Sequence, residues 1–489
     1  MKRAKHNLSH YKLATCNMGQ AIPISCVPVL PGDTVQHATS AMIRLSPLNT
    51  PVMHPTSVRV HHFFVPNRIT WPESEDGGWE QFITGGPNGD NAEAIPSFNL
   101  PNSDGTNKII DYLYGAYRDG SGSFGVSELP LRAFNKIINE YYRDQDLVTA
   151  RLENDTTVPR IAWEKDYFGV ARPWTQKGPD VSLPIGNADV YYNDDGIGNS
   201  LTVKNSDTGM DHEMVVNGNV QPGAETVSKE LFAQFDSGSA LSVNDFRTAF
   251  SVQRYQEARA RYGSRFTEYL RYLGIRPSDA RLQRPEYLGG GTSRVNFSEV
   301  LQTTPQDDSG EPDPQRGIGV GDMYGHGIAG VRSNRYRKFF EEHGYVISIM
   351  SARPKAIYVN GIPREFLKRT KEDFFQKELA NLGQQEVYQG ELYAADGTHL
   401  NVWGFTDRYE EYRRQQSQVH GDFRTTLDGY HMGRDLAADV ALNASFIECD
   451  PTDRIFQIGE DVADTLWCFI NHKMVARRMV PKRANPRIL

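Results

Sequence analysis

The chain has 489 residues, of which 38% are hydrophobic, 23% charged and 11% aromatic, and its formal net charge is −8. This is an ordinary globular composition, which excludes a collagen-like or wholly disordered chain. The aromatic share, together with 43 glycines and 27 prolines, favours strands joined by many loops.

The charge is distributed unevenly along the chain. No acid precedes Asp33 and none follows Asp464, so an acidic body carries two basic ends. Either the ends aid solubility, or both face a polyanion. We interpret residues 1–20 and 470–489 as a basic N-terminal arm and a basic C-terminal arm. The candidate nucleic-acid-facing residues are Lys2, Arg3, Lys5, Lys473, Arg477, Arg478, Lys482, Arg483 and Arg487.

Three apolar segments predict strands. Residues 22–30 are strand-like but contain two prolines, so this strand is expected at a sheet edge or with bulges. Residues 57–65 carry apolar groups on both faces and are expected inside a sheet. Residues 345–350 are expected to form a buried strand. These strands are separated by long segments rich in turn residues.

Three segments predict helices: residues 129–143, 244–273 and 373–382. The second has an arginine-rich face, which is either solvated or a subunit interface, where arginine is over-represented. The candidate interface residues are Arg247, Arg254, Arg261 and Arg265. Residues 71–127 are expected to be loop-rich, and the polar stretch 191–223 reads as a surface insertion carrying at most a hairpin.

The final strand prediction covers residues 465–480, which open as a buried strand and continue into the basic tail. The cations of that tail could contact phosphates. Trp467, Phe469 and His472 could stack on unpaired bases, but the alternation of Trp467 and Phe469 is more typical of core residues.

No motif in the sequence proposes an enzyme. Residues 325–330 match GxGxxG but follow a glycine-rich stretch, so 302–330 is expected to be an irregular segment with a mobile loop. His61 and His62 point to opposite faces of a strand and are expected to be packed or hydrogen-bonded, not metal-bound. The acids of 307–313 are expected to be a solvated loop. No catalytic residue, metal site or cofactor is predicted.

The cysteines and the hydropathy set the expected compartment. Cys16, Cys26, Cys449 and Cys468 form no paired motif and are expected to be reduced, mostly buried thiols. No secretion signal and no membrane span is predicted. We therefore expect a protein made and kept in the cytosol of its producer, or released by lysis.

Several motifs together resemble one known family. The stretches HNLSHYKLATCNMGQAIPISCVPVLPGDTV and SPLNTPVMHPTSVRVHHFFVPNRITW are similar to the major capsid protein of gokushoviruses, which are microviruses with circular single-stranded DNA. The similarity continues through residues 184–186, 244–277 and 284–290, and through Trp467-Cys468 and the terminal PRIL. It spans nearly the whole chain.

This resemblance implies a mainly β fold: residues 1–489 as a single eight-stranded antiparallel β-barrel, the viral jelly roll, with long loop insertions containing a few helices. It implies a T=1 icosahedral shell, built through pentamers, that encloses single-stranded DNA. It also implies as partners an internal scaffolding protein, small DNA-binding and pilot proteins, and a receptor on the bacterial surface. The chain would be assembled in the host cytoplasm and reside in the virion. We then expect that replacing Arg477, Arg478, Lys482 and Arg483 with Gln leaves the fold intact and weakens DNA packaging.

The resemblance further implies that an insertion forms protrusions on the three-fold axes and takes part in host attachment. We assign this role to residues 180–235, with candidates Tyr191, Asn193, Asp194, Asp211 and Asn217. Two other classes stay open at this point: a jelly-roll enzyme or carbohydrate-binding module, and an adhesin or tail component. A coat protein would elute as shells or pentamers, whereas an enzyme would elute as a small oligomer. An adhesin would often repeat, and no repeat is found.

Overall fold

The structure is a computed structural model. It describes residues 3–75, 77–85, 94–100, 108–115, 124–179, 181, 188–192, 201–204, 211–214, 231–235, 243–262, 265–301, 303, 323–394, 399–438, 440–460 and 462–483. The chain divides into two compact units, one formed by Met1–Thr175 with Arg261–Leu489 and the other by Gln176–Ala260. The predicted insertion, 180–235, lies within the second unit.

A four-stranded antiparallel sheet forms one layer of the first unit, in the order β12 (Glu286–Arg294), β5 (Thr56–Pro66), β16 (Gly344–Pro354), β3 (Ala21–Val29). The prolines of β3 fit its edge position, because proline has no backbone N–H to donate to a neighbouring strand. Strand β5 is interior, and Val58, Val60 and Val65 are fully buried. These three strand predictions, for residues 22–30, 57–65 and 345–350, are confirmed.

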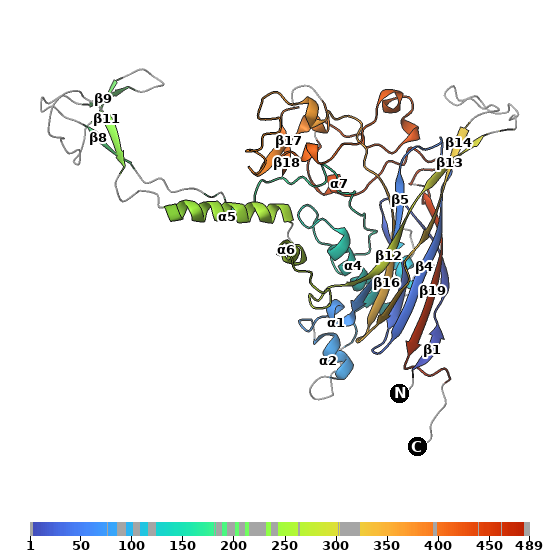
Figure 1. Ribbon diagram of the computed structural model, residues 1–489. Coiled ribbons are helices and arrows are strands. Elements are labelled where there is room, and N and C mark those ends of the chain that lie inside the picture. The colour runs from blue at the N-terminus through green and yellow to red at the C-terminus, as the bar shows by residue number, and fades with distance from the viewer. Residues whose placement is uncertain are drawn as a thin grey trace. The chain divides into compact units, whose positions relative to one another are not determined.

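A seven-stranded antiparallel sheet forms the other layer. Its main path runs β1 (Ala4–Asn7), β19 (Leu466–Arg478), β4 (Thr34–Leu45), β14 (Met323–Arg332), β13 (Asn296–Leu301). Strand β2 (His10–Cys16) also pairs with β19, and β15 (Tyr336–Phe339) also pairs with β4. Figure 1 shows β4 and β19 running side by side. Most of the predicted N-terminal arm therefore lies in β1 and β2, and the first part of the predicted C-terminal arm, residues 470–478, lies in β19.

The GxGxxG segment was predicted to be an irregular mobile loop, and this is wrong. Residues 323–332 form β14, which pairs with both β4 and β13. The glycines serve packing: a Cβ on Gly325 would lie 2.4 Å from the carbonyl oxygen of Thr50, and one on Gly327 would lie 2.9 Å from Leu45. Without side chains at these positions, the neighbouring backbone can approach closely.

The hydrophobic core lies between the two sheets. Ile22 and Ile24 from β3, Ile43 from β4, and Ile347 from β16 are fully buried in one continuous cluster. The four-stranded and seven-stranded sheets hold eleven of the described strands and form no closed barrel. The prediction of a mainly β fold is confirmed, and the single eight-stranded barrel stays a prediction. Two packed sheets stay separate because of their twist, and a barrel closes only where strand tilt and register bring the edge strands together.

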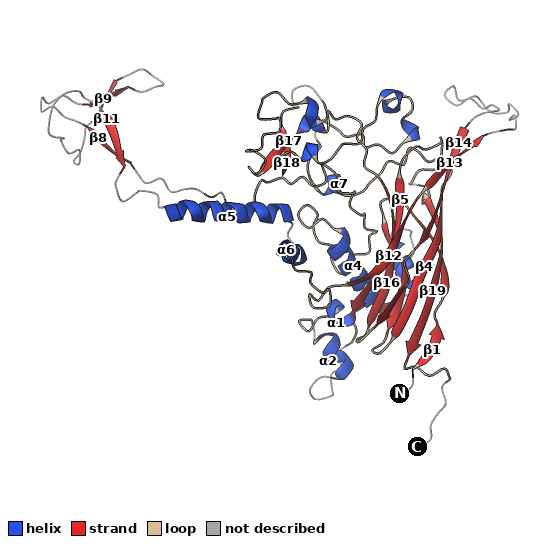
Figure 2. Cartoon of the chain, in the orientation of Figure 1, coloured by secondary structure: helices blue, strands red, loops and turns tan. Residues whose placement is uncertain are grey.

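Three helices pack against the four-stranded sheet, on one side of the strands in Figure 2. They are α1 (Asn67–Thr70), α3 (Lys108–Tyr114) and α4 (Leu129–Ile137), which continues as a π-helical turn, Ile138–Tyr142. Helix α2 (Gly78–Thr84) packs on α1. The helix predicted over residues 129–143 is confirmed. Helices α2 and α3 fall in the stretch predicted to be loop-rich.

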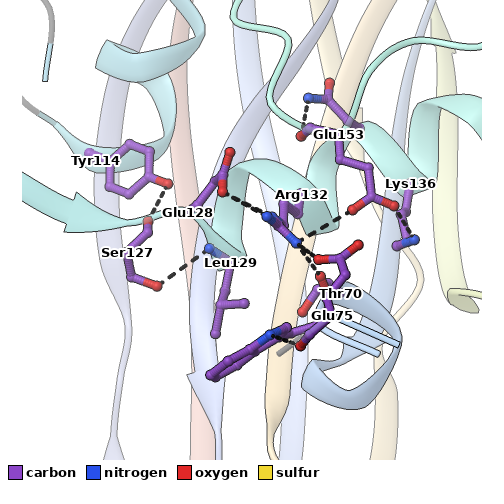
Figure 3. A network of polar contacts seen from close by, with 11 residues as sticks. Thr70, Glu75, Tyr114, Ser127, Glu128, Leu129, Arg132, Lys136 and Glu153 are labelled. Carbon is purple, nitrogen blue, oxygen red and sulfur yellow. Dashed lines mark hydrogen bonds and ion pairs between the residues drawn. The ribbon is translucent and has the colours of Figure 1, made fainter. Parts of the chain in front are cut away.

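One arginine ties these helices together (Figure 3). The Arg132 guanidinium on α4 forms ion pairs with Glu128 at 2.9 Å and with Glu75 at 2.6 Å. It also donates to the carbonyl oxygen of Thr70, at the end of α1. Burial would lower the pKa of Arg132, but the two carboxylates outweigh it, and the pKa is raised. The charge of the Arg132 guanidinium is thus neutralised by acids of the same chain.

The remaining elements are peripheral. Short antiparallel pairs join β6 (Ser97–Asn99) to β7 (Gly125–Ser127), β8 (Ala188–Tyr192) to β11 (Leu231–Phe235), β9 (Leu201–Lys204) to β10 (Asp211–Met214), and β17 (Gln384–Tyr388) to β18 (Val402–Asp407). The other helices are α5 (Val243–Tyr262), α6 (Phe266–Tyr272) and α7 (Ala444–Ile447). The 3-10 turns are Arg364–Phe366, Gln389–Glu391, Glu410–Tyr412, Gly421–Arg424 and Asp428–Tyr430.

Two helix predictions need correction. Residues 244–273 form two helices, α5 and α6, on either side of a Gly-Ser pair, whereas one helix was expected. The second helix begins anew after Arg265, whose backbone is extended at φ −78° and ψ 140°. Residues 373–382 form a series of turns and no helix. In 191–223, where at most a hairpin is expected, the described residues hold one, β9 with β10. A second strand pair, β8 with β11, flanks this stretch.

Candidate nucleic-acid interface

The solvent-facing side of the seven-stranded sheet is cationic. Its seven strands contain nine lysines and arginines but a single acid, Glu299. Alternation along each strand places every second side chain outside. The exposed outward cations, which we call the cationic face, are Lys5, Arg44, Arg332, Arg337, Lys473 and Arg477. Glu299 pairs in register with Gly325, on the opposite side of β13 from Ser298 and its partner His326.

The strand register brings these cations together from distant parts of the chain. Lys5 on β1 lies directly opposite Arg477 on β19. On the other side of β19, Lys473 pairs with Ala38 of β4, so small side chains leave the ammonium accessible. None of the six forms an ion pair or side-chain hydrogen bond within the described residues. Like charges held this close are unfavourable unless an anion neutralises them.

Arg478 was predicted to face nucleic acid, and the structure contradicts this. Its guanidinium forms an ion pair with Asp33 at 2.8 Å and donates to the carbonyl oxygen of Pro28 at 2.6 Å. The Asp33 carboxylate is fully buried. Arg478 follows Arg477 in an alternating strand, so its side chain points back into the fold. The expectation that Arg478→Gln leaves the fold intact is corrected accordingly.

The other predicted cations lie around the edge of the cationic face or outside the described residues. The Arg3 guanidinium lies 5.1 Å from the ring centre of Phe339, over the end of β15. Lys482 and Arg483 are exposed just beyond β19. Lys2 and Arg487 fall outside the described residues.

Sequence reasoning missed three members of the cationic face: Arg44, Arg332 and Arg337. They lie far from the basic ends, and only the pairing of β4 with β14 and β15 gathers them. A local signal existed, since Arg44 ends a strand that alternates strictly between buried and exposed residues. A cation at an outward position of such a strand marks a solvated face.

Trp467 and Phe469 are exposed on the same face, at 45% and 43%. The interpretation that favoured a core position for them is therefore wrong. The stacking hypothesis for His472 is also wrong, because its ring is fully buried. Tyr11 on β2 stacks on Phe469 with ring centres 5.7 Å apart, so aromatic rings and cations share this surface.

Beneath the cationic face, histidines form a neutral hydrogen-bonded chain between the sheets. His472 Nε2 donates to the carbonyl oxygen of Ile24, so its Nδ1 accepts, and His37 Nε2 lies 3.2 Å from it. Tyr336 then donates to His37 Nδ1. Burial, first of all, lowers the pKa of both histidines to about 3. Protonating either ring would replace an acceptor with a donor that faces another donor.

The neighbouring histidines are also occupied. Burial likewise lowers the pKa of His62 to about 3, and its Nδ1 lies 2.8 Å from the Ser348 hydroxyl. His61, on the other side of β5, lies 2.8 Å from the Tyr142 hydroxyl. The prediction of packed, hydrogen-bonded histidines is confirmed. In the part of the chain that the structure describes, no three or more His, Cys, Asp or Glu side chains are placed so that they could hold a metal ion.

Known proteins share this sequence over nearly its full length. The family profile described as capsid protein (F protein) matches residues 1–486. The chain belongs to this phage capsid protein family. Capsid protein VP1 of Bdellovibrio phage phiMH2K is 30% identical, with 92% of this chain and 89% of the relative aligned. Capsid protein VP1 of Chlamydia phage 1 is 28% identical over 94% and 91%, and that of Spiroplasma virus 4 is 27% identical over 92% and 88%.

These relatives are gokushovirus proteins, so the resemblance stated above is confirmed. The chain is the major capsid protein of a microvirus, a structural component of the virion and not an enzyme. A capsid protein self-associates into a shell. No helix among the described residues has the length and apolar content needed to cross a membrane.

The capsid protein's predicted interface arginines fall into two groups. Arg247 and Arg254 are exposed on α5. Arg261 pairs with Asp407 at 3.2 Å. Arg265 uses its guanidinium within its own chain, because it donates to the carbonyl oxygens of Asn139, Glu140 and Arg143 at the end of the π-helical turn. Burial lowers the pKa of Arg265. Its observed role is therefore to cap a helix.

Of the capsid protein's candidate attachment residues, Tyr191 lies in β8 and Asp211 in β10. Asn193, Asp194 and Asn217 fall outside the described residues, as do residues 184–186 and 307–313. The four cysteines are free thiols, and all but Cys26 are buried. The prediction of reduced, mostly buried cysteines is confirmed.

Proposed function

We propose that copies of this capsid protein form a T=1 icosahedral shell around a circular single-stranded DNA, with the cationic face turned inward. The observation that carries the proposal is the set of six exposed outward cations on this face, in strands whose single acid is Glu299. A face this one-sided binds polyanions by releasing their counterions, whatever their sequence.

The two-sheet arrangement supports a jelly-roll ancestry for the fold. Successive strands change layers: β3 lies in the four-stranded sheet, β4 in the seven-stranded sheet, and β5 in the four-stranded sheet again. Strands β13 and β14 lie in the seven-stranded sheet before β16 returns. Such exchange between two packed antiparallel sheets is the pattern of viral jelly rolls.

Exposed apolar side chains on α5 and α6 support self-assembly. Phe250 is 63% exposed, Phe266 61% and Tyr255 51%. Contiguous apolar residues left in water mark interaction sites, and obligate subunit interfaces are the most apolar of these. We propose that these helices, with Arg247 and Arg254, contact neighbouring subunits in pentamers and between pentamers.

We further propose that residues 180–235 form the protrusion and take part in attachment to a receptor on the bacterial surface. Their polar composition and their place in a separate compact unit support this. The internal scaffolding protein, the small DNA-binding protein and the pilot protein are the proposed assembly partners, in the host cytoplasm. The family membership supports all three.

The test of the inward cationic face compares two triple variants of the full chain, produced with its phage partners. Lys5, Lys473 and Arg477 are replaced with Gln in one, and the exposed Arg369, Lys371 and Lys377, which lie outside the strands, in the other. We expect both to assemble, but only the first to give a reduced fraction of DNA-filled particles. Sedimentation and the ultraviolet absorbance ratio measure this. Wild-type yields of filled particles from the first variant would refute the proposal.

A further inference from the structure

A hollow of about 620 Å³ opens on the cationic face, between strands β2, β4 and β19 and helix α3. This volume lies within the range of small-molecule sites. Its lining includes an apolar group, Leu13, Met42, Trp467 and Phe469. It also includes three cations, Lys12, Arg44 and Lys108, and two acids, Asp111 and Asp464. It is the place where the aromatic and the cationic residues of this face converge.

The sheet register explains the apolar floor of the hollow. Phe469 lies between Leu13 of β2 and Met42 of β4, and all three side chains point outward. Leu13 is 79% exposed and Met42 44%. Trp467 continues this floor by one outward position along β19. Four large apolar side chains gathered in water indicate a surface that is covered in use.

Two of the three cations around the hollow already have partners. Lys12 donates to the carbonyl oxygens of Pro23 and Tyr112 and lies near Asp111. Lys108 is paired with Asp464 at 2.7 Å, and that carboxylate, 8% exposed, also accepts from the Thr15 hydroxyl. The Trp467 indole N–H donates to the Asp464 carbonyl oxygen, which fixes the ring's orientation. Arg44, in register beside Trp467, has no ion pair or side-chain hydrogen bond within the described residues. An aromatic face therefore lies next to an unneutralised guanidinium.

We propose that this hollow binds an unpaired nucleotide of single-stranded DNA, with its base on Trp467 and Phe469 and its phosphate on Arg44. The inference rests on the proposed inward orientation of the cationic face and adds a defined base-binding site to it. Bases of single strands can stack on aromatic side chains, whereas those of a duplex are already stacked on one another. The hollow therefore selects single-stranded over double-stranded DNA.

The experiment measures binding of oligonucleotides to the full-length chain by fluorescence anisotropy. The probes are an oligomer of about 12 thymidines, within the footprint of known single-strand sites, and an abasic oligomer of equal length. Trp467→Leu is expected to weaken thymidine-oligomer binding by about 5- to 150-fold, the range for loss of one stacked base. The abasic oligomer should bind both proteins equally. Trp467→Phe should restore most of the loss.

Two controls separate stacking from charge and from misfolding. Phe366→Leu removes a ring that is 75% exposed outside the sheet and should change neither affinity. Arg44→Gln should lower the slope of log affinity against log salt by about 0.7, whereas Trp467→Leu should leave it unchanged, because only the arginine neutralises a phosphate. If Trp467→Leu fails to fold, ultraviolet cross-linking of the wild-type chain should attach the thymidine oligomer within residues 466–478.

Each outcome has a separate meaning. Equal binding of the thymidine oligomer to the wild type and Trp467→Leu, or a cross-link confined to other segments, would overturn the nucleotide site. A loss that is the same for the abasic oligomer would also overturn it, because the ring would then act through the backbone or the fold. If Lys473→Gln or Arg477→Gln weakens binding while Trp467→Leu does not, the proposed function stands and this inference fails. If none of the three has an effect, both fail.

Discussion

The two sheets of the capsid protein treat their charges in opposite ways. The helices on the four-stranded sheet neutralise their arginines within the fold: Arg132 binds Glu75 and Glu128, and Arg68 binds Glu342 at 2.8 Å. The seven-stranded sheet leaves six outward cations without such partners among the described residues. Arginine thus stabilises the fold through ion pairs beside one sheet, and on the outward face of the other sheet it has no ion-pair partner among the described residues. What decides between these roles is whether the fold supplies an acid.

The same contrast appears between two adjacent residues of β19. Arg477 is exposed beside Lys5, whereas Arg478 turns inward to a fully buried Asp33. A block of basic residues in a sequence therefore contains two kinds of charge, separated by strand alternation. The following predictions test that separation.

The largest expected effect concerns acid and the histidines between the sheets. His37, His62 and His472 have pKa values of about 3 in the fold and an ordinary value of 6.5 when unfolded. The unfolded chain therefore binds more protons as the pH falls below 6.5, and stability is lost. At pH 5 each contributes a loss of about 2 kcal/mol. Urea unfolding at pH 7.5 and pH 5 measures the difference. A pH-independent midpoint would contradict it, and His472→Gln should make the profile shallower.

The second effect separates Arg478 from Arg477. Arg478→Met leaves the buried Asp33 carboxylate unpaired, which is expected to lower the free energy of unfolding by about 3–5 kcal/mol. Arg477→Met, its matched control, should change it by less than about 0.5 kcal/mol, as for most surface positions. Denaturant midpoints of the two variants decide. Equal midpoints would show that strand alternation does not separate the two arginines.

The third effect tests the tie on the helices. Arg132→Leu removes ion pairs to Glu75 and Glu128 and a hydrogen bond to the Thr70 carbonyl. We expect a loss of about 2–3 kcal/mol, the scale of hydrogen bonds to charged groups. Oligonucleotide affinity should stay at the wild-type value, since this charge is consumed inside the fold. A weaker affinity in the correctly folded variant would count against the division between the two sheets.

The smallest effect concerns single members of the cationic face. Lys5→Gln and Arg477→Gln should each lower the slope of log affinity against log salt by about 0.7. Each should change stability by less than about 0.5 kcal/mol. A salt titration of oligonucleotide binding with the full chain gives the slope. Unchanged slopes for both would show that the phosphates lie elsewhere.

Much of the β framework could be predicted from local pattern. The prolines of residues 22–30 indicated an edge strand, and the two-faced apolar pattern of 57–65 indicated an interior one. The short helices α2 and α3 were not predicted, because seven residues show too little helical periodicity to be distinguished from a loop. Strand β14 could not be predicted, because its glycines allow Thr50 and Leu45 to approach closely, and these contacts are not visible in the local sequence.

The positive charge of the candidate interface could be predicted from the sequence, but the residues that form it could not. The basic ends pointed to a polyanion, and Lys5, Lys473 and Arg477 do lie on the cationic face. Arg44 and Arg332 joined them only through pairing between β4 and β14. Arg478 does not belong to the cationic face, because its guanidinium donates to the carbonyl oxygen of Pro28, which lies 450 residues earlier in the chain. Long-range pairing, absent from any local window, decided both changes.

The central place of β19 has a consequence for biosynthesis. This strand is bonded to β4 on one side and to β1 and β2 on the other, yet it leaves the ribosome after all of them. Until residues 466–478 emerge, β4 keeps an open edge, and the nascent chain has no continuous seven-stranded sheet. Pairings this distant in sequence form slowly, and unpaired edges invite association. Completion of the sheet is therefore a late event in folding, which delays the assembly-competent surface until β19 has been synthesised.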